Sequence, residues 1–140
     1  MLFRSVPRDR AVFISAQGLF MYFEEQEVRQ LIRDMFDTFS EGVLMFDSIP
    51  RWLSRRTLSA KGWKKTSHYR TPRMPWGINR NEICETLRQW SDKITRIEEA
   101  SYAEFPRGMA KWLFPLFLSL PVLRNYAPTG NIVYFSQEAV

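Results

Sequence analysis

The residues best suited to bind a ligand follow two short apolar stretches, residues 11–15 and 42–50. Gln17 and Gly18 come directly after the first stretch, and Asp47 lies near the end of the second. A glutamine amide offers both donors and an acceptor, and a glycine lets the backbone turn sharply close to a ligand. These residue types predict a site for a small polar molecule. A competing interpretation is that Gly18 only begins a loop and that Asp47 caps the next helix.

A run of apolar and aromatic side chains, residues 19–23, follows Gly18 before any charged residue. Such side chains could wall an apolar pocket beside the polar groups. They could equally belong to the protein core. The pattern leaves both interpretations open.

Residues 51–81 form a basic, aromatic segment without any acidic residue, and we expect a short helix followed by a loop or lid. The segment predicts one of three roles: it holds an acidic substrate, binds nucleic acid through charge and stacking, or forms a solvated face. A net charge of +5 suits nucleic acid, but no RRM, KH or zinc-finger signature is present. The candidate cations for an acidic substrate are Arg51, Arg55, Arg56 and Arg73, and the interleaved aromatic residues are Trp52, Trp63, Tyr69 and Trp76.

One cysteine, Cys84, and one histidine, His68, exclude an internal disulfide and a Cys/His zinc site. We therefore expect no metal, and the low cysteine content favours a reducing, cytoplasmic location. The N-terminus lacks the apolar stretch of a secretory signal. The longest apolar run, 112–123, is shorter than the roughly 20 residues that span a membrane, so we expect no membrane partner.

The order of elements at the start of the chain predicts how the strand ends are positioned. Apolar residues 11–15 predict a buried strand without alternation, residues 24–39 an amphipathic helix, and residues 42–50 a second buried strand. Such a strand–helix–strand unit has parallel strands and a right-handed crossover. Ligands in sheets of this kind bind just outside the carboxyl ends of the strands, where Gln17 and Asp47 fall.

The rest of the chain predicts further α/β elements within a single domain, residues 1–140. The composition, with 45% hydrophobic and 25% charged residues, is that of a globular protein. The expected elements are a helix over 79–94 with Asn79 or Asn81 as its N-cap, a strand over 95–105, a helix over 107–120 and a strand over 131–136.

Three blocks of this sequence together resemble a known family. They are VFISAQGLFMYFEEQEVRQLI, GVLMFDSIPRWLSRRTL and YRTPRMPWGINRNEI. They resemble the second half of the class I S-adenosylmethionine-dependent O-methyltransferases of the leucine carboxyl methyltransferase and polyketide-type group, over most of residues 9–112. The resemblance implies an α/β fold: the C-terminal half of a Rossmann-like sheet, with about four strands, the first two parallel, flanked by helices.

The resemblance also implies roles for particular residues. The family has Ala-Glu-Gly, followed by Leu, an aliphatic residue and Tyr, where this chain has Ala16-Gln17-Gly18 followed by Leu19, Phe20, Met21 and Tyr22. Ala16, Gln17 and Gly18 are then expected beside S-adenosylmethionine. Gln17 replaces the acidic residue, so it brings no negative charge toward the sulfonium. On the substrate side we expect Tyr22, Asp47, Arg51 and Trp76.

The implied reaction is methyl transfer to a carboxylate or a hydroxyl of a small molecule. A carboxylate acceptor is already ionised at neutral pH and needs no general base. A hydroxyl acceptor would be helped by a base, for which His68 is the only histidine. The competing interpretation of His68 is a solvated loop residue.

A glycine-rich, cofactor-binding turn is not found in this sequence. The glycines are widely spaced, at Gly18, Gly42, Gly62, Gly77, Gly108 and Gly130. We therefore expect only the C-terminal half of the family's domain, with an incomplete cofactor site and no activity on its own, or a truncated product that has lost activity. The strand at 11–15 would then have an unpaired edge, open to self-association or to an N-terminal-half partner.

Overall fold

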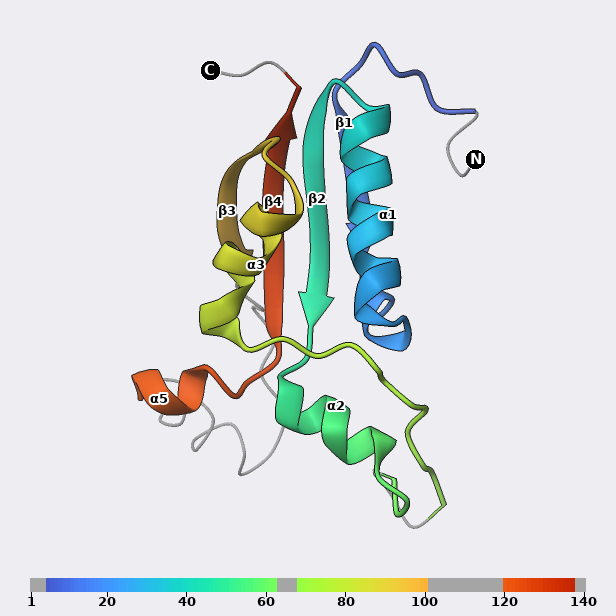
Figure 1. Ribbon diagram of the computed structural model, residues 1–140, viewed down its shortest axis with the longest axis vertical. Coiled ribbons are helices and arrows are strands. Elements are labelled where there is room, and N and C mark those ends of the chain that lie inside the picture. The colour runs from blue at the N-terminus through green and yellow to red at the C-terminus, as the bar shows by residue number, and fades with distance from the viewer. Residues whose placement is uncertain (1–4, 63–67, 101–119, 138–140) are drawn as a thin grey trace.

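The computed structural model describes residues 5–62, 68–100 and 120–137, and in them a four-stranded sheet carries helices on one face (Figure 1). The strands are β1 (Val12–Ala16), β2 (Glu41–Ser48), β3 (Ile94–Ala100) and β4 (Thr129–Ser136). The helices are α1 (Glu25–Thr38), α2 (Arg51–Leu58), α3 (Ile83–Trp90) and α5 (Pro121–Arg124), with short 3-10 turns η1 (Phe20–Tyr22) and η2 (Arg80–Glu82).

The sheet is mixed, with the strand order β1-β2-β4-β3. β1 and β2 run parallel, with Val12 opposite Gly42 and Ala16 opposite Phe46, which confirms the predicted parallel pair. β4 enters between β2 and β3 and is antiparallel to both. This α/β sheet with flanking helices is compatible with part of a methyltransferase fold.

Two features of the sequence explain where helix α1 forms: the residues that cap its N-terminus and its apolar stripe. The side chain of Glu24 caps the backbone of the first turn, and Glu27 accepts a hydrogen bond from the N–H of Glu24 at 2.9 Å. The buried face of α1 consists of Val28, Ile32, Met35 and Phe36. Their spacing of three and four residues places them on the side that faces the sheet.

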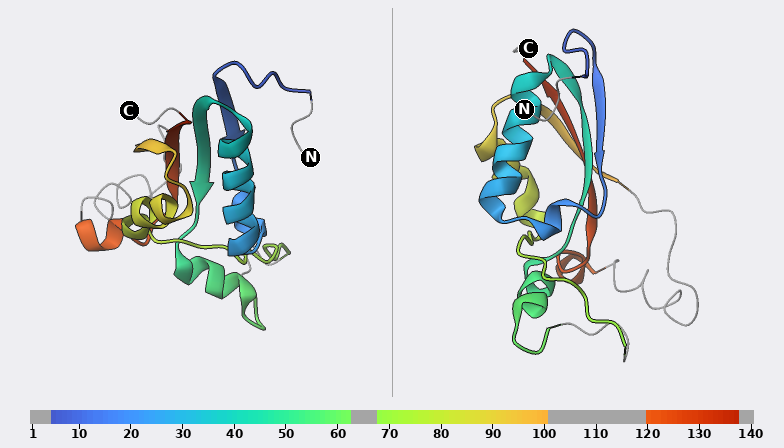
Figure 2. Two further views of the ribbon diagram at one scale, coloured as in Figure 1. Left: turned by 45° about the horizontal axis from the view of Figure 1, so that its top comes forward. Right: turned by 90° about the vertical axis from the view of Figure 1, so that its right-hand side faces the viewer.

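The core lies between the sheet and the layer formed by α1 and α3, which cover the same face (Figure 2). Leu44 and Phe46 of β2 and Val133 and Phe135 of β4 alternate toward this layer and are buried. The ring of Phe36 stacks on Phe135 with centroids 4.2 Å apart. The helix α3 contributes Ile83, Leu87 and Trp90 to this core, and all three are buried.

The prediction that 11–15 is a buried strand without alternation is wrong, because exposure alternates along β1. Phe13 is 67% exposed and Ser15 is exposed, whereas Ala16 is buried. The physical reason is that β1 is at the edge of the described sheet and only one of its faces meets the helices. Some apolar residues of β1 therefore face the core and others face solvent, although their residue types suggest that all of them are buried.

Element boundaries differ from expectation in the second half of the chain. The helix expected over 79–94 is the turn η2 followed by α3, which ends at Trp90. Asn79 and Glu82 form the capping box that begins it, so Asn79 is the N-cap. Residues 101–105 of the expected third strand, and nearly all of the helix expected over 107–120, lie outside the described residues.

Candidate functional site

The carboxyl ends of β1 and β2 meet, as the parallel arrangement requires, and a direct hydrogen bond joins them. The backbone N–H of Gly18 donates to Oδ1 of Asp47 over 2.6 Å. Gly18 has φ of +59°, a left-handed conformation that favours glycine, and no other atom would lie within 4 Å of a Cβ there. The backbone therefore turns next to open space.

Gln17 lies beside this turn on the face of the sheet that α1 and α3 leave uncovered. Gln17 follows the last residue of β1 and contacts Met45, which points away from the core because its neighbours Leu44 and Phe46 point into it. Its amide Nε2 is 4.0 Å from the sulfur of Met45, a weak interaction. Gln17 therefore retains donor and acceptor capacity for a ligand. Ala16, Gln17, Gly18 and Asp47 are the predicted site residues that the structure brings together.

Tyr22 lies at the end of η1, on the same end of the sheet. Tyr22 is 43% exposed. The turn before it is anchored, since Phe20 is buried in the main core and Met21 packs in a smaller cluster with Ile49 and Leu53. A fixed backbone that carries an exposed phenol suits a residue that contacts a substrate.

Arg51 is committed to an ion pair in this structure. Its Nε donates to Oε2 of Glu82 over 2.8 Å, and its backbone N–H donates to the side chain of Asn79 over 3.2 Å. This hydrogen bond from Arg51 is the main reason that the pKa of the Glu82 carboxyl lies below its ordinary value. Arg51 thus fixes the start of α2 against η2, and its role toward a substrate stays a prediction.

Trp76 is a core residue, 2% exposed. Its ring lies against Phe46 and Trp90 with centroids about 6 Å away, and its backbone N–H donates to the carbonyl of Met21 over 3.3 Å. These contacts tie the basic segment to the sheet. No ligand-facing surface of Trp76 is apparent, so its predicted substrate contact gains no support from the geometry.

Two polar clusters near the strand ends have no counterpart in the sequence predictions. Asn131 is buried and donates to the hydroxyl of Ser48 over 3.1 Å, which ties the end of β2 to β4. Glu99 of β3 pairs with both Arg80 and Arg124. Burial, and secondly the charge of Arg124, lowers the pKa of Arg80. An asparagine within the apolar run 131–136 was the only sequence signal for the first cluster.

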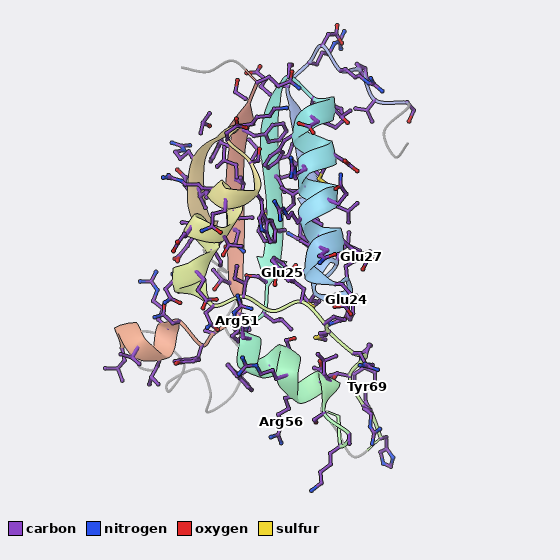
Figure 3. The ribbon with its side chains drawn as sticks, in the orientation of Figure 1. Glu24, Glu25, Glu27, Arg51, Arg56 and Tyr69 are labelled. Carbon is purple, nitrogen blue, oxygen red and sulfur yellow. The ribbon has the colours of Figure 1, made fainter. Side chains whose placement is uncertain are left out.

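The basic segment projects beyond the end of the sheet, with Arg51 at its base and Arg56 and Tyr69 farther out (Figure 3). Its helix, α2, and the loop after it agree with the predicted helix and loop, although Trp63 lies outside the described residues. Several of its exposed cations form no ion pair with any described residue: Arg55, Arg56, Lys61, Arg70 and Arg73. His68 is exposed. The lid role of the segment stays a prediction.

Two other features are absent from residues 5–62, 68–100 and 120–137. No helix there is long and apolar enough to cross a membrane. No group of three or more His, Cys, Asp or Glu side chains there is arranged to hold a metal ion. The single cysteine, Cys84, is exposed.

The structure is an α/β sheet flanked by helices, and comparison with curated proteins finds a relative of this chain. The chain is 26% identical over 127 residues to the tetracenomycin polyketide synthesis O-methyltransferase TcmP of Streptomyces glaucescens. The match covers 86% of this chain but 44% of that enzyme. No family model matches the chain. The similarity supports a methyltransferase relationship without indicating a subgroup.

Proposed function

We propose that this chain provides the substrate side and part of the cofactor side of an S-adenosylmethionine-dependent O-methyltransferase. The observation that carries the proposal is the similarity to an O-methyltransferase along 86% of the chain. The joined ends of β1 and β2 support it, because α/β sheets bind ligands at this edge. Within the group, the leucine carboxyl methyltransferase and polyketide type remains our proposal.

Ala16, Gln17 and Gly18 are the residues that would hold the cofactor. The open space beside Gly18 and the amide of Gln17, which makes only a weak interaction with Met45, would suit one side of a polar ligand. When bound, S-adenosylmethionine supplies the methyl group to be transferred. Asp47 holds the turn at Gly18 in place, and Tyr22 would contact the substrate.

The acceptor is a carboxylate or a hydroxyl of a small molecule. A carboxylate would need only alignment and exclusion of water, because it is already ionised. A hydroxyl would need a base. His68, the only histidine of the sequence, is exposed on the basic segment, 51 positions after Gln17. The chain on its own is proposed to lack activity, since it contributes only one side of the cofactor site.

Calorimetric titration with S-adenosylmethionine tests this proposal. The chain is titrated alone and after assembly with the part of TcmP that lies outside the matched region. We expect binding at micromolar affinity only in the assembled sample, weakened about tenfold by Gln17→Ala, which removes one hydrogen-bonding side chain. Gln26→Ala, at an exposed position of α1, is the matched control. Absence of binding in the assembled sample would contradict the proposal.

A second candidate function is nucleic-acid binding by the basic segment. The observation in its favour is that five cations are exposed without an ion pair to described residues, namely Arg55, Arg56, Lys61, Arg70 and Arg73, and that Trp52 of the same segment is exposed. Such binding would weaken steeply with added salt, whereas a cofactor site would respond little. Titration of a fluorescent single-stranded oligonucleotide at two salt concentrations distinguishes them.

A further inference from the structure

We propose that α2 and α5 together form a docking surface for an acidic, amphipathic segment of another protein. The two elements are joined, because the indole Nε1 of Trp52 donates to the backbone carbonyl of Tyr126 over 2.9 Å. Both elements lie beyond the end of the sheet (Figure 1). The α2–α5 patch is defined by five exposed residues: Trp52, Arg55 and Arg56 of α2, Val122 of α5, and Tyr126 in the turn after α5.

The apolar part of the patch consists of three large side chains. Trp52 is 46% exposed, Val122 69% and Tyr126 47%. The backbone N–H of Tyr126 donates to the carbonyl of Leu123 over 3.0 Å, so the chain continues to turn after α5. The single polar atom of the Trp52 side chain is bonded to Tyr126, which leaves an apolar indole surface exposed to solvent. Exposed apolar side chains grouped in this way mark a contact surface.

The charged part of the patch is formed by Arg55 and Arg56. They follow Trp52 by three and four positions, so all three share the outer face of α2, opposite its buried face. Figure 3 shows Arg56 directed away from the sheet. Neither arginine forms an ion pair with any described residue, and residues 51–81 contain no carboxylate. A partner that supplies carboxylates would therefore complement this part of the patch.

The residue types of the patch favour a protein partner over other anionic partners. Tryptophan, tyrosine and arginine are the types enriched where proteins bind one another, and they carry most of the binding energy there. Nucleic acid would offer phosphates to the arginines and bases to Trp52, but no preferred contact to the aliphatic Val122. A lipid surface takes up apolar side chains that project into it, whereas Trp52 is tied back to Tyr126.

The expected partner segment combines two chemical features. It carries carboxylates for Arg55 and Arg56, and apolar side chains that cover Trp52, Val122 and Tyr126. An amphipathic helix with acidic residues beside its apolar stripe has both features. The inference goes beyond the proposed function, because none of the patch residues belongs to the group that β1 and β2 bring together.

The test measures the binding of a synthetic probe to the full chain by fluorescence anisotropy. The probe is a fluorescein-labelled peptide of about 20 residues, with leucine at every third or fourth position and glutamate elsewhere. We expect saturable binding at micromolar affinity, and no binding of a second peptide in which glutamine replaces every glutamate.

Variants of the chain locate the binding surface. Arg55→Glu should weaken binding of the glutamate peptide about tenfold, and Val122→Ser about fivefold, because each removes one kind of contact. Arg33→Glu, at an exposed position of α1 outside the patch, is the matched control for the change of charge. Arg56→Glu replaces Arg55→Glu if circular dichroism shows that the latter does not fold.

The inference is overturned if the glutamate peptide does not bind, if the glutamine peptide binds equally well, or if Arg33→Glu weakens binding as much as Arg55→Glu. Unchanged binding by Val122→Ser overturns it as well. Tighter binding of a single-stranded oligonucleotide or of phosphatidylserine vesicles, lost in the same variants, would assign the patch to nucleic acid or to a membrane surface instead. Failure of the titration with S-adenosylmethionine would remove the proposed function and leave this inference standing.

Discussion

The backbone N–H of Gly18 and the carboxylate of Asp47 are joined by a 2.6 Å hydrogen bond across the ends of two parallel strands. The two residues are 29 positions apart in the chain, and α1 lies between them. Their contact fixes the turn that carries Gln17 relative to the end of β2. The first two predictions concern this contact.

Asp47→Ala removes the acceptor of the Gly18 N–H. We expect the free energy of unfolding to fall by about 1 kcal/mol, since the bond involves a charged group but is exposed to water. Urea denaturation measures this fall in the free energy of unfolding. Asp47→Asn keeps an oxygen acceptor at the same place and should cost less. Equal losses from both variants would show that the hydrogen bond itself contributes little.

Gly18→Ala tests the turn itself. The Cβ would meet no atom within 4 Å, so the cost comes only from the φ of +59° and should be about 1 kcal/mol. Gly18→Asn should lose less, because asparagine tolerates the left-handed region better. An alanine variant as stable as the wild type in thermal unfolding would contradict this account.

Gly42→Ala tests the close approach of β1 and β2. A Cβ at Gly42 would lie 2.5 Å from the carbonyl oxygen of Val12 and 2.8 Å from the ring of Phe135. Because the first contact is with backbone, we expect a loss of about 3 kcal/mol in urea denaturation, more than for Gly18→Ala. A loss smaller than that of Gly18→Ala would be inconsistent with this strand spacing.

The ion pair between Arg51 and Glu82 predicts a dependence of stability on pH. The hydrogen bond from Arg51 lowers the pKa of Glu82 in the folded state below its ordinary value of 4.5. The unfolded state therefore binds a proton at a higher pH than the folded state. Stability from this pair is present above pH 4.5 and is lost as pH falls through the lower folded-state pKa.

Glu82→Gln measures this contribution. The difference in melting temperature between wild type and Glu82→Gln should be constant near neutral pH and should shrink below pH 4.5. Asp92→Asn, at an exposed carboxylate without an ion pair to a described residue, is the control. A difference that stays constant down to about pH 3, roughly 1.5 units below the ordinary value of 4.5, would argue against the pair.

Local patterns were sufficient to predict the elements near the start of the chain. Val28, Ile32 and Met35 repeat at helical spacing, and α1 buries them. The order strand, helix, strand predicted the parallel pair because few connections of that length allow another arrangement. Gly18 indicated the turn at the end of β1, since its φ is one that other residues rarely adopt.

Features that depend on distant partners could not be predicted from sequence. The exposure of Phe13 depends on whether another element covers its face of the sheet, which residue type does not reveal. Arg51 was expected to face a substrate, but it pairs with Glu82, a residue 31 positions away. The placement of β4 between β2 and β3 likewise depends on pairings between segments far apart in the chain.

The position of β4 also constrains the order in which the molecule folds. β3 pairs only with β4 among the described strands, and β4 follows β3 in the chain. During synthesis on the ribosome, β3 therefore has no described strand to pair with until residues 129–136 have emerged from the exit tunnel. The β1–α1–β2 unit can dock early, but the far half of the sheet assembles only after translation has passed β4.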